Sequence, residues 1–139
     1  LSIRRQRQMC IRDSKMPAYA SLLRYEDIEA VQDRCKHAKD LGYNYIKLHE
    51  IFTSEVEAAR NILGDETPIM VDTNCPWTKD KARQMLTEWE DYNLYLVEEP
   101  INPPEDFESL SFLEKGQGIN KFESILIKRL YQILSQLNN

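Results

Sequence analysis

The sequence contains only four glycines, and none of them forms a glycine-rich turn after a predicted strand. A dinucleotide-binding fingerprint and a P-loop both need such a turn, so neither kind of site is expected. The sequence also lacks an apolar run near the roughly 20 residues that span a bilayer, and no apolar signal core is present at its start. We therefore expect no membrane partner and no export.

Cysteine is scarce as well. Cys10, Cys35 and Cys75 are odd in number and lack the spacing of a metal site, so free thiols in the cytoplasm are the plain interpretation. The formal net charge of −5 argues against nucleic acid and anionic membranes as partners. With 139 residues, 42% of them hydrophobic, the chain has the size of one ordinary domain.

The two ends differ in composition from the middle. Residues 1–14 are rich in arginine without a strand or helix period, and Arg4–Ser14 resembles a translated sequencing-library adapter. We therefore expect residues 1–14 to be a non-native segment and exclude them from functional reasoning. Residues 119–139 are either a genuine amphipathic helix or a frame-shifted tail, because glycine and alanine disappear there.

Residues 15–118 alternate between short apolar runs and amphipathic helical patterns. The runs predict buried parallel strands at 17–23, 44–48, 68–73 and 94–98. Helical spacing predicts helices after each strand, the last near Glu105–Lys115, with a capping box at Ser54 and Glu57 and an N-cap at Thr78. This repeat predicts an α/β fold: a partial TIM-type (β/α)8 barrel of about four βα units, or else a doubly wound sheet.

Charged side chains gather where three of these strands end. Lys47 and His49 alternate on one side of the second strand, Asp72 ends the third strand, and Glu98 ends the fourth. The carboxyl ends of parallel strands meet at one edge, where active sites of such folds lie. Basic groups beside carboxylates suit a metal ion with a proton-transfer base next to it.

Each of these residues also has a simpler interpretation. Asp72 alone suits a helix cap or a turn amide, and Lys47 suits an ion pair with Glu50 or Glu55. In the same way, Trp77 either lines a substrate site or, slightly favoured, packs against a neighbouring helix. These alternatives stay open from the sequence.

Glu98 is a stronger candidate than Asp72, because Glu98 and Glu99 place two like charges at a buried strand terminus. The two side chains point in opposite directions, so we expect only one of them to be a metal ligand. For the base, an imidazole has an ordinary pKa of about 6.5, already near neutral pH. His49 is therefore the predicted base, with Lys47 as its electrostatic partner.

The segment from about Met16 to Gly118 resembles the barrel domain of the mandelate racemase/muconate lactonizing enzyme family of the enolase superfamily. Lys47–His49 corresponds to the Lys-x-Lys motif of the second strand. Asp72–Asn74 corresponds to the Asp-x-Asn motif of the third strand, and Glu98–Pro100 to the Glu-Glu-Pro motif of the fourth. His49 stands in place of the second lysine, so the lysine-base assignment does not transfer unchanged.

The resemblance implies Mg²⁺ held by Asp72, Glu98 and a third carboxylate, with Asn74 contacting the substrate or supporting the ligands. It implies abstraction of the proton next to the carboxylate of a small hydroxy acid or acid sugar, through an enediolate intermediate. Racemases, epimerases and acid-sugar dehydratases share this step, and a homo-oligomeric parent is expected.

Because the third ligand and the later strands are not found, we expect the chain itself to be an inactive fragment. The alternative is a small non-catalytic α/β domain, either receiver-like or for interaction. A receiver places acidic residues at the end of its first strand, and Ala18–Ser21 offers none.

Overall fold

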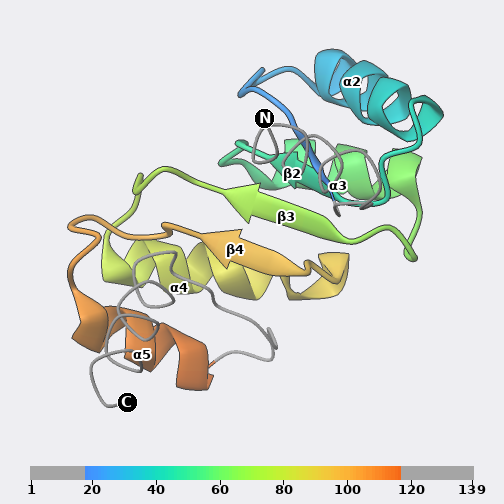
Figure 1. Ribbon diagram of the computed structural model, residues 1–139. Helices are drawn as coiled ribbons and strands as arrows, with labels where there is room; N and C mark the ends of the chain where they lie inside the picture. Colours follow the sequence, from blue (N-terminus) through green and yellow to red (C-terminus); the bar gives the residue numbers. More distant parts are fainter. Residues whose placement is uncertain (1–17, 117–139) are drawn as a thin grey trace, which may run out of the picture.

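The computed structural model describes residues 18–116; the expectations for residues 1–14 and 119–139 lie outside this range. Strands and helices alternate along this part of the chain (Figure 1). The strands are β1 (Ala20–Ser21), β2 (Ile46–Leu48), β3 (Ile69–Asp72) and β4 (Leu96–Glu98). The helices are α2 (Ile28–Asp40), α3 (Thr53–Leu63), α4 (Lys79–Glu88) and α5 (Phe107–Gly116), with a 3-10 helix η1 (Glu90–Tyr92) before β4.

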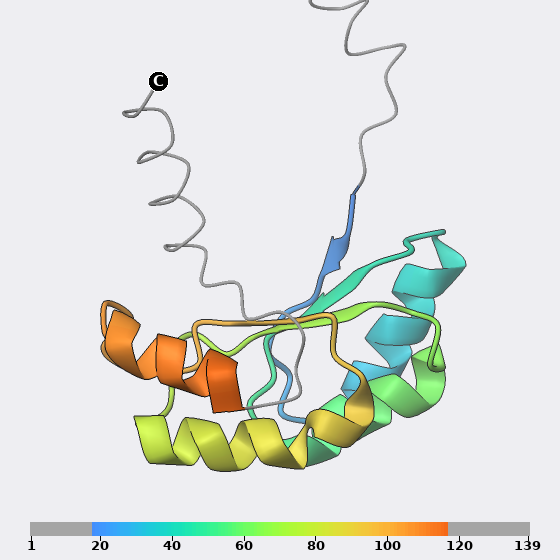
Figure 2. The ribbon, with the colours of Figure 1, turned by 90° about the horizontal axis from the view of Figure 1, so that it is seen from below.

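The four strands form one parallel sheet in the order β1-β2-β3-β4. Each strand therefore lies beside the next one in the sequence, with a helix in each connection. Figure 2 shows α2, α3 and α4 on the same side of this sheet. A doubly wound sheet carries helices on both faces, so this arrangement is that of a barrel wall and not of the doubly wound alternative.

The core lies between the sheet and these helices. Ile46 and Leu48 of β2, and Ile69 and Val71 of β3, are at most 1% exposed and belong to one apolar cluster with helix residues. Lys47 alternates with the first pair and therefore points to the opposite face. Period-2 alternation thus directs these apolar residues to the helices and places Lys47, Asp72 and Glu98 on the other face of the sheet, together with Met70 and Leu96.

The first strand is shorter than predicted. Ala20 N and Leu22 N donate to Tyr45 O and Lys47 O, and within residues 18–23 only Ala20–Ser21 is strand. Beyond Leu22 the chain leaves β2 and forms the β1–α2 loop, because its backbone and side-chain donors bind the end of β2 instead of the ladder.

One of the two predicted helix caps is confirmed. Thr78 caps α4, its side chain accepting from Lys81 N. The capping box at Ser54 is wrong, because the N-cap of α3 is Phe52, two residues earlier, and makes no side-chain cap hydrogen bond. The Ser54 hydroxyl donates to Glu55 instead.

Two further interpretations from the sequence are confirmed. Trp77 is 7% exposed and packs edge-to-face on Trp89 with ring centroids 5.4 Å apart, so its role is packing. Cys35 and Cys75 are free thiols. Burial, together with the charge of Glu50, raises the pKa of Cys35 to about 12.

Within residues 18–116 no helix is long and apolar enough to cross a membrane.

Arg60 links the two loops that precede β3 and β4, at the edge of the sheet where the strands begin. Its side chain is nearly buried and donates to four backbone carbonyls, at 2.7 to 3.0 Å. Gly64 O and Thr67 O belong to the α3–β3 connection, whereas Tyr92 O and Asn93 O precede β4. A planar guanidinium has donors in enough directions to satisfy all four acceptors at once.

We expect Arg60→Lys to lower the free energy of unfolding by about 2–4 kcal/mol, because an ammonium leaves buried carbonyls without a donor. Urea unfolding followed by circular dichroism measures the loss. The matched control is Arg83→Lys, whose side chain is 56% exposed, and it should change stability by less than about 0.5 kcal/mol. Equal effects of the two changes would contradict this role of Arg60.

Candidate active site

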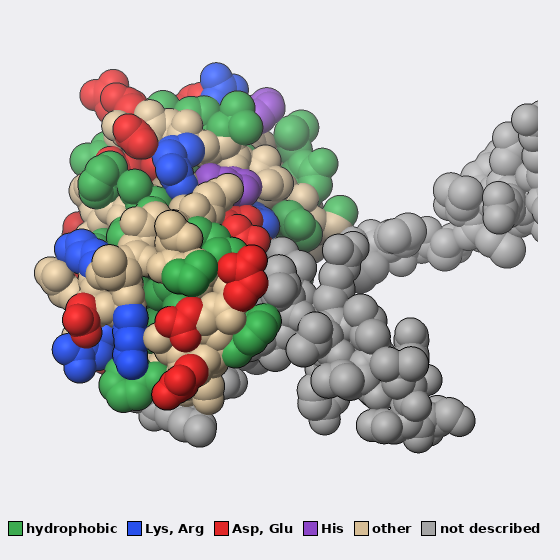
Figure 3. Space-filling view, turned by 90° about the vertical axis from the view of Figure 1, so that its left-hand side faces the viewer, with side chains coloured by type: hydrophobic (Ala, Val, Ile, Leu, Met, Phe, Trp, Pro, Cys, Tyr) green, Lys and Arg blue, Asp and Glu red, His purple; other side chains and the backbone are tan. Residues whose placement is uncertain are grey.

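The predicted site residues meet at the edge formed by the carboxyl ends of β2, β3 and β4. Asp72 is the register partner of Glu98, and Leu48 of β2 is the partner of Val71. Figure 3 looks onto this edge, where histidine, basic and acidic side chains gather near the centre of the face. Parallel pairing is what brings these residues together, since all the strands end on the same side.

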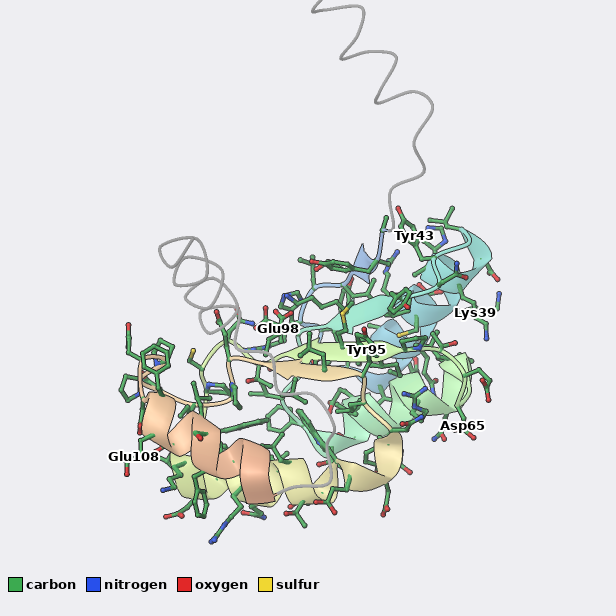
Figure 4. All side chains as sticks on the ribbon, turned by 60° about the horizontal axis from the view of Figure 1, so that its bottom comes forward. Lys39, Tyr43, Asp65, Tyr95, Glu98 and Glu108 are labelled. Carbon is green, nitrogen blue, oxygen red and sulfur yellow. The ribbon has the colours of Figure 1, made fainter. Side chains whose placement is uncertain are left out.

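Lys47 is the centre of the charged cluster. Its Nζ atom lies 2.8 Å from Asp72 Oδ2 and 2.7 Å from Glu98 Oε2, and all three side chains are at most 12% exposed. Figure 4 labels Glu98 at the end of its strand, beside the side chains of the neighbouring strands. The simpler interpretation, an ion pair of Lys47 with Glu50 or Glu55, is therefore wrong.

The charge state of Lys47 follows from these contacts. Burial alone would lower its pKa, but hydrogen bonds and attraction from Asp72 and Glu98 outweigh burial and raise the pKa of Lys47 above 10.5. A pKa raised on folding stabilises the fold below the unfolded value, and this contribution is lost only as the pH rises through the folded value. Lys47 is thus an ammonium ion at neutral pH.

Asn74 supports Asp72. Asn74 N and Nδ2 lie 3.1 and 3.2 Å from Asp72 Oδ1, so this oxygen is bound by the turn while Oδ2 is bound by Lys47. Asp72 therefore accepts a hydrogen bond from a turn amide, which was the simpler prediction for this residue. It also forms part of the charged cluster. Both of its oxygens are fixed in direction.

His49 lies beside the cluster and is partly buried. Its Nε2 atom is 3.7 Å from Asp72 Oδ2, the same oxygen that binds Lys47. Its Nδ1 atom is hydrogen-bonded to Leu22 O in the β1–α2 loop. A hollow of about 270 Å³ opens next to this imidazole, lined by Leu23, Arg24, His49 and Asn74.

Glu99 points away from the cluster, as predicted from its alternation with Glu98. Its backbone is left-handed, with φ 50°, and its carboxylate lies 3.8 Å from Cys75 Sγ. Cys75 N and the Thr73 hydroxyl both donate to Glu99 O at 2.7 Å. These bonds join the ends of β3 and β4 just beyond the ion pairs, and they hold left-handed backbone at Cys75 (φ 55°) as well.

Residues 30–121 match the family described as Enolase C-terminal domain-like. The chain belongs to this family. It is similar to a racemase from Streptomyces coelicolor A3(2) with bound magnesium, at 26% identity and a TM-score of 0.69. It is also similar to a member of the enolase superfamily from Polaromonas sp. JS666, at 27% identity and a TM-score of 0.70. The alignments cover 75% and 78% of this chain but 31% of each relative.

A curated relative is more similar over a shorter stretch. L-talarate/galactarate dehydratase from Salmonella typhimurium is 44% identical over 45 residues, which are 32% of this chain and 11% of that protein. An L-talarate/galactarate dehydratase mutant liganded with Mg and L-glucarate has the same fold, at a TM-score of 0.65 and 23% identity. The four βα units of this enolase C-terminal domain-like chain are thus part of a TIM-type barrel.

The carboxylates at this edge are of the kind that binds a hard cation, but they make up only part of a metal site. Two carboxylate oxygens from adjacent strands converge on one cationic atom, Lys47 Nζ, within 2.8 Å. Carboxylate oxygens are the ligands that Mg²⁺ prefers, and Asp72 and Glu98 together carry more negative charge than Lys47 neutralises. Among residues 18–116 no group of three His, Cys, Asp or Glu residues is arranged to hold a metal ion.

Two residues at this edge were missed by the sequence analysis, Arg24 and Glu50. Arg24 donates from Nε to His49 O at 2.7 Å and from Nη2 to Thr73 O at 2.9 Å. Glu50 is fully buried, and its carboxylate accepts from Tyr25 N and Glu26 N. The signal for Glu50 was its alternation with Lys47 and His49, which puts a carboxylate on the helix-covered side, where it must find donors.

Removal of the Lys47 charge should destabilise the fold. We expect Lys47→Met to lower the free energy of unfolding by about 3–5 kcal/mol, because Asp72 and Glu98 are left close together and nearly buried without a cation. Millimolar Mg²⁺ should restore part of this loss. Urea unfolding with and without Mg²⁺ measures both effects.

The control for this change is Lys36→Met. Lys36 also forms an ion pair, with Asp40 at 2.9 Å, but both side chains are more than 60% exposed. Its loss should cost less than about 1 kcal/mol and should not respond to Mg²⁺. Equal losses in the two variants would show that burial adds nothing to the Lys47 pairs.

Proposed function

We propose that the full-length protein containing this chain abstracts the proton next to the carboxylate of a small hydroxy acid or acid sugar. The observation that carries this proposal is the convergence of Lys47, His49, Asp72 and Glu98 at one strand edge in a chain of the enolase family. Racemases and dehydratases among the similar proteins support the same reaction class. The receiver-like alternative loses support from the one-sided helices and the family match.

His49 is the proposed base. Lys47 is held as an ammonium ion by two carboxylates, so it has no lone pair with which to accept a proton. His49 Nε2 faces the same oxygen of Asp72 and lies beside the open hollow, where a substrate carbon has room to approach. The positive charge of Lys47 would stabilise negative charge on the substrate after the proton has moved to His49.

Asp72 and Glu98 are the proposed ligands of Mg²⁺, together with a third carboxylate outside the described residues. A bound Mg²⁺ would stabilise the negative charge that develops on the substrate carboxylate. In this chain Asn74 would keep Asp72 Oδ1 in place, and Arg24 would keep the ends of β2 and β3 together. The chain spans 31% of the length of each of these two solved relatives. We propose that groups in the rest of the full-length protein decide between racemisation and dehydration.

Metal binding should depend on Glu98 and Asp72. We expect Glu98→Gln and Asp72→Asn to weaken Mn²⁺ or Mg²⁺ binding by at least about tenfold, since even residues behind metal ligands contribute that much. Isothermal titration of the full-length protein measures the dissociation constant. Glu99→Gln is the matched control, because this adjacent carboxylate points toward Cys75 and should leave the affinity unchanged. Unchanged affinity in Glu98→Gln would refute the ligand assignment.

Proton abstraction should depend on His49. We expect His49→Gln in the full-length protein to slow exchange of the substrate α-proton with deuterated solvent by about 10²–10⁴-fold, with metal affinity retained. Proton NMR of acid-sugar and hydroxy-acid substrates measures the exchange. His37→Gln, a change at an exposed histidine on α2, serves as the control. Exchange at the normal rate in His49→Gln would mean that the base lies elsewhere in the protein.

A further inference from the structure

The imidazole of His49 is fixed in one tautomer by a backbone group. Its Nδ1 atom is hydrogen-bonded to Leu22 O. A carbonyl oxygen can only accept, so Nδ1 must carry the proton of this bond. In the neutral imidazole Nε2 is then the nitrogen with the lone pair, and it is the atom that faces the charged cluster, 3.7 Å from Asp72 Oδ2.

The loop that carries the Leu22 carbonyl is bound at the end of β2: Leu22 N donates to Lys47 O, and Glu50 binds the residues that follow. The β1–α2 loop, residues 22–27, contains Glu26 in a left-handed conformation with φ 52°, which is unfavourable for a residue other than glycine. Such a conformation persists where the surroundings fix it, and here one carboxylate does so. Glu50 accepts from Tyr25 N at 2.7 Å and from Glu26 N at 3.2 Å.

Glu50 suits this role because a carboxylate offers two acceptor oxygens. Its Oε1 and Oε2 atoms each take one of the two successive amides, and the side chain is 0% exposed, so water does not compete for them. An amide side chain has one acceptor oxygen and would turn an NH₂ group toward the second N–H. Arg24 adds a second link between the loop and the end of β2 from the solvent side, because its Nε atom donates a hydrogen bond to His49 O.

We propose that Glu50 is a positioning residue, which holds the β1–α2 loop so that Leu22 O fixes His49 in the Nδ1–H tautomer. This inference rests on the proposed function only where it makes Nε2 the proton acceptor. The free imidazole ring favours the opposite tautomer, with the proton on Nε2, so the loop selects the form that leaves a base directed at the site.

The test is nitrogen NMR of the 139-residue chain labelled with ¹⁵N-histidine, at a pH where both imidazoles are neutral. A protonated and an unprotonated ring nitrogen have widely separated shifts, so the spectrum reports the tautomer directly. We expect His49 to have its proton on Nδ1, and the exposed His37 to have the averaged shifts of a free ring. Averaged shifts, or a proton on Nε2, at His49 would overturn the proposal.

Variants test the part played by Glu50. Glu50→Gln should lose the Nδ1–H pattern of His49 and move its shifts toward those of His37, whereas Glu66→Gln, an exposed change at the opposite end of the sheet, should not. Arg24→Ala keeps the buried carboxylate and should cause a smaller displacement in the same direction. Circular dichroism shows whether each variant is folded. An unchanged His49 pattern in a folded Glu50→Gln chain would remove Glu50 from this role. If Glu50→Gln unfolds, an unchanged His49 pattern in a folded Arg24→Ala chain would count against the role of the loop.

The measurement needs neither metal nor substrate, so it separates this inference from the proposed function. An Nδ1–H pattern together with normal α-proton exchange in His49→Gln would refute His49 as the base and leave the tautomer assignment intact. Averaged nitrogen shifts at His49, together with the loss of α-proton exchange in His49→Gln, would refute the tautomer assignment and leave His49 as the base.

Discussion

The ion pairs of Lys47 with Asp72 and Glu98 are the interaction on which this edge of the molecule depends. Three consecutive strands each contribute one of these charges, and all three side chains are nearly buried. Carboxylates this close would repel one another and unfold the strand ends if no cation lay between them. The same cluster places two carboxylates and one ammonium group beside His49.

The backbone at this edge is as constrained as the side chains. Asn74, Cys75 and Glu99 all have left-handed backbone, and bonds from Thr73 and Cys75 to Glu99 O keep the ends of β3 and β4 together. At the other edge, where the strands begin, Arg60 donates to four carbonyls. Both edges satisfy backbone carbonyls with a guanidinium, Arg24 at the site and Arg60 at the far edge. At the site edge a carboxylate, Glu50, also satisfies two backbone amides.

The helix-covered face of the sheet and its strand ends differ in chemistry, and this difference suits the proposed function. The face of the sheet covered by helices is apolar and supplies stability, whereas the strand ends hold polar groups in fixed directions, as preorganised catalysis requires. Membership in the Enolase C-terminal domain-like family agrees with this layout, since the family match covers the strands that carry Lys47, Asp72 and Glu98. The reaction class proposed above rests on these strand ends.

The sequence by itself determined the order of the elements, the parallel sheet and four of the residues at the site. Apolar runs marked β2, β3 and β4, and the charged or polar residues at or next to the carboxyl ends of these runs marked Lys47, His49, Asp72 and Glu98. Only the tertiary structure decided the partners. Lys47 pairs across the sheet and not with Glu50. Arg24 and Glu50 are linked to the site by hydrogen bonds of the β1–α2 loop, and the predicted strand 17–23 covered only the first two residues of this loop. Contacts between distant segments depend on register and loop geometry, which alternation of residue types along one chain does not encode.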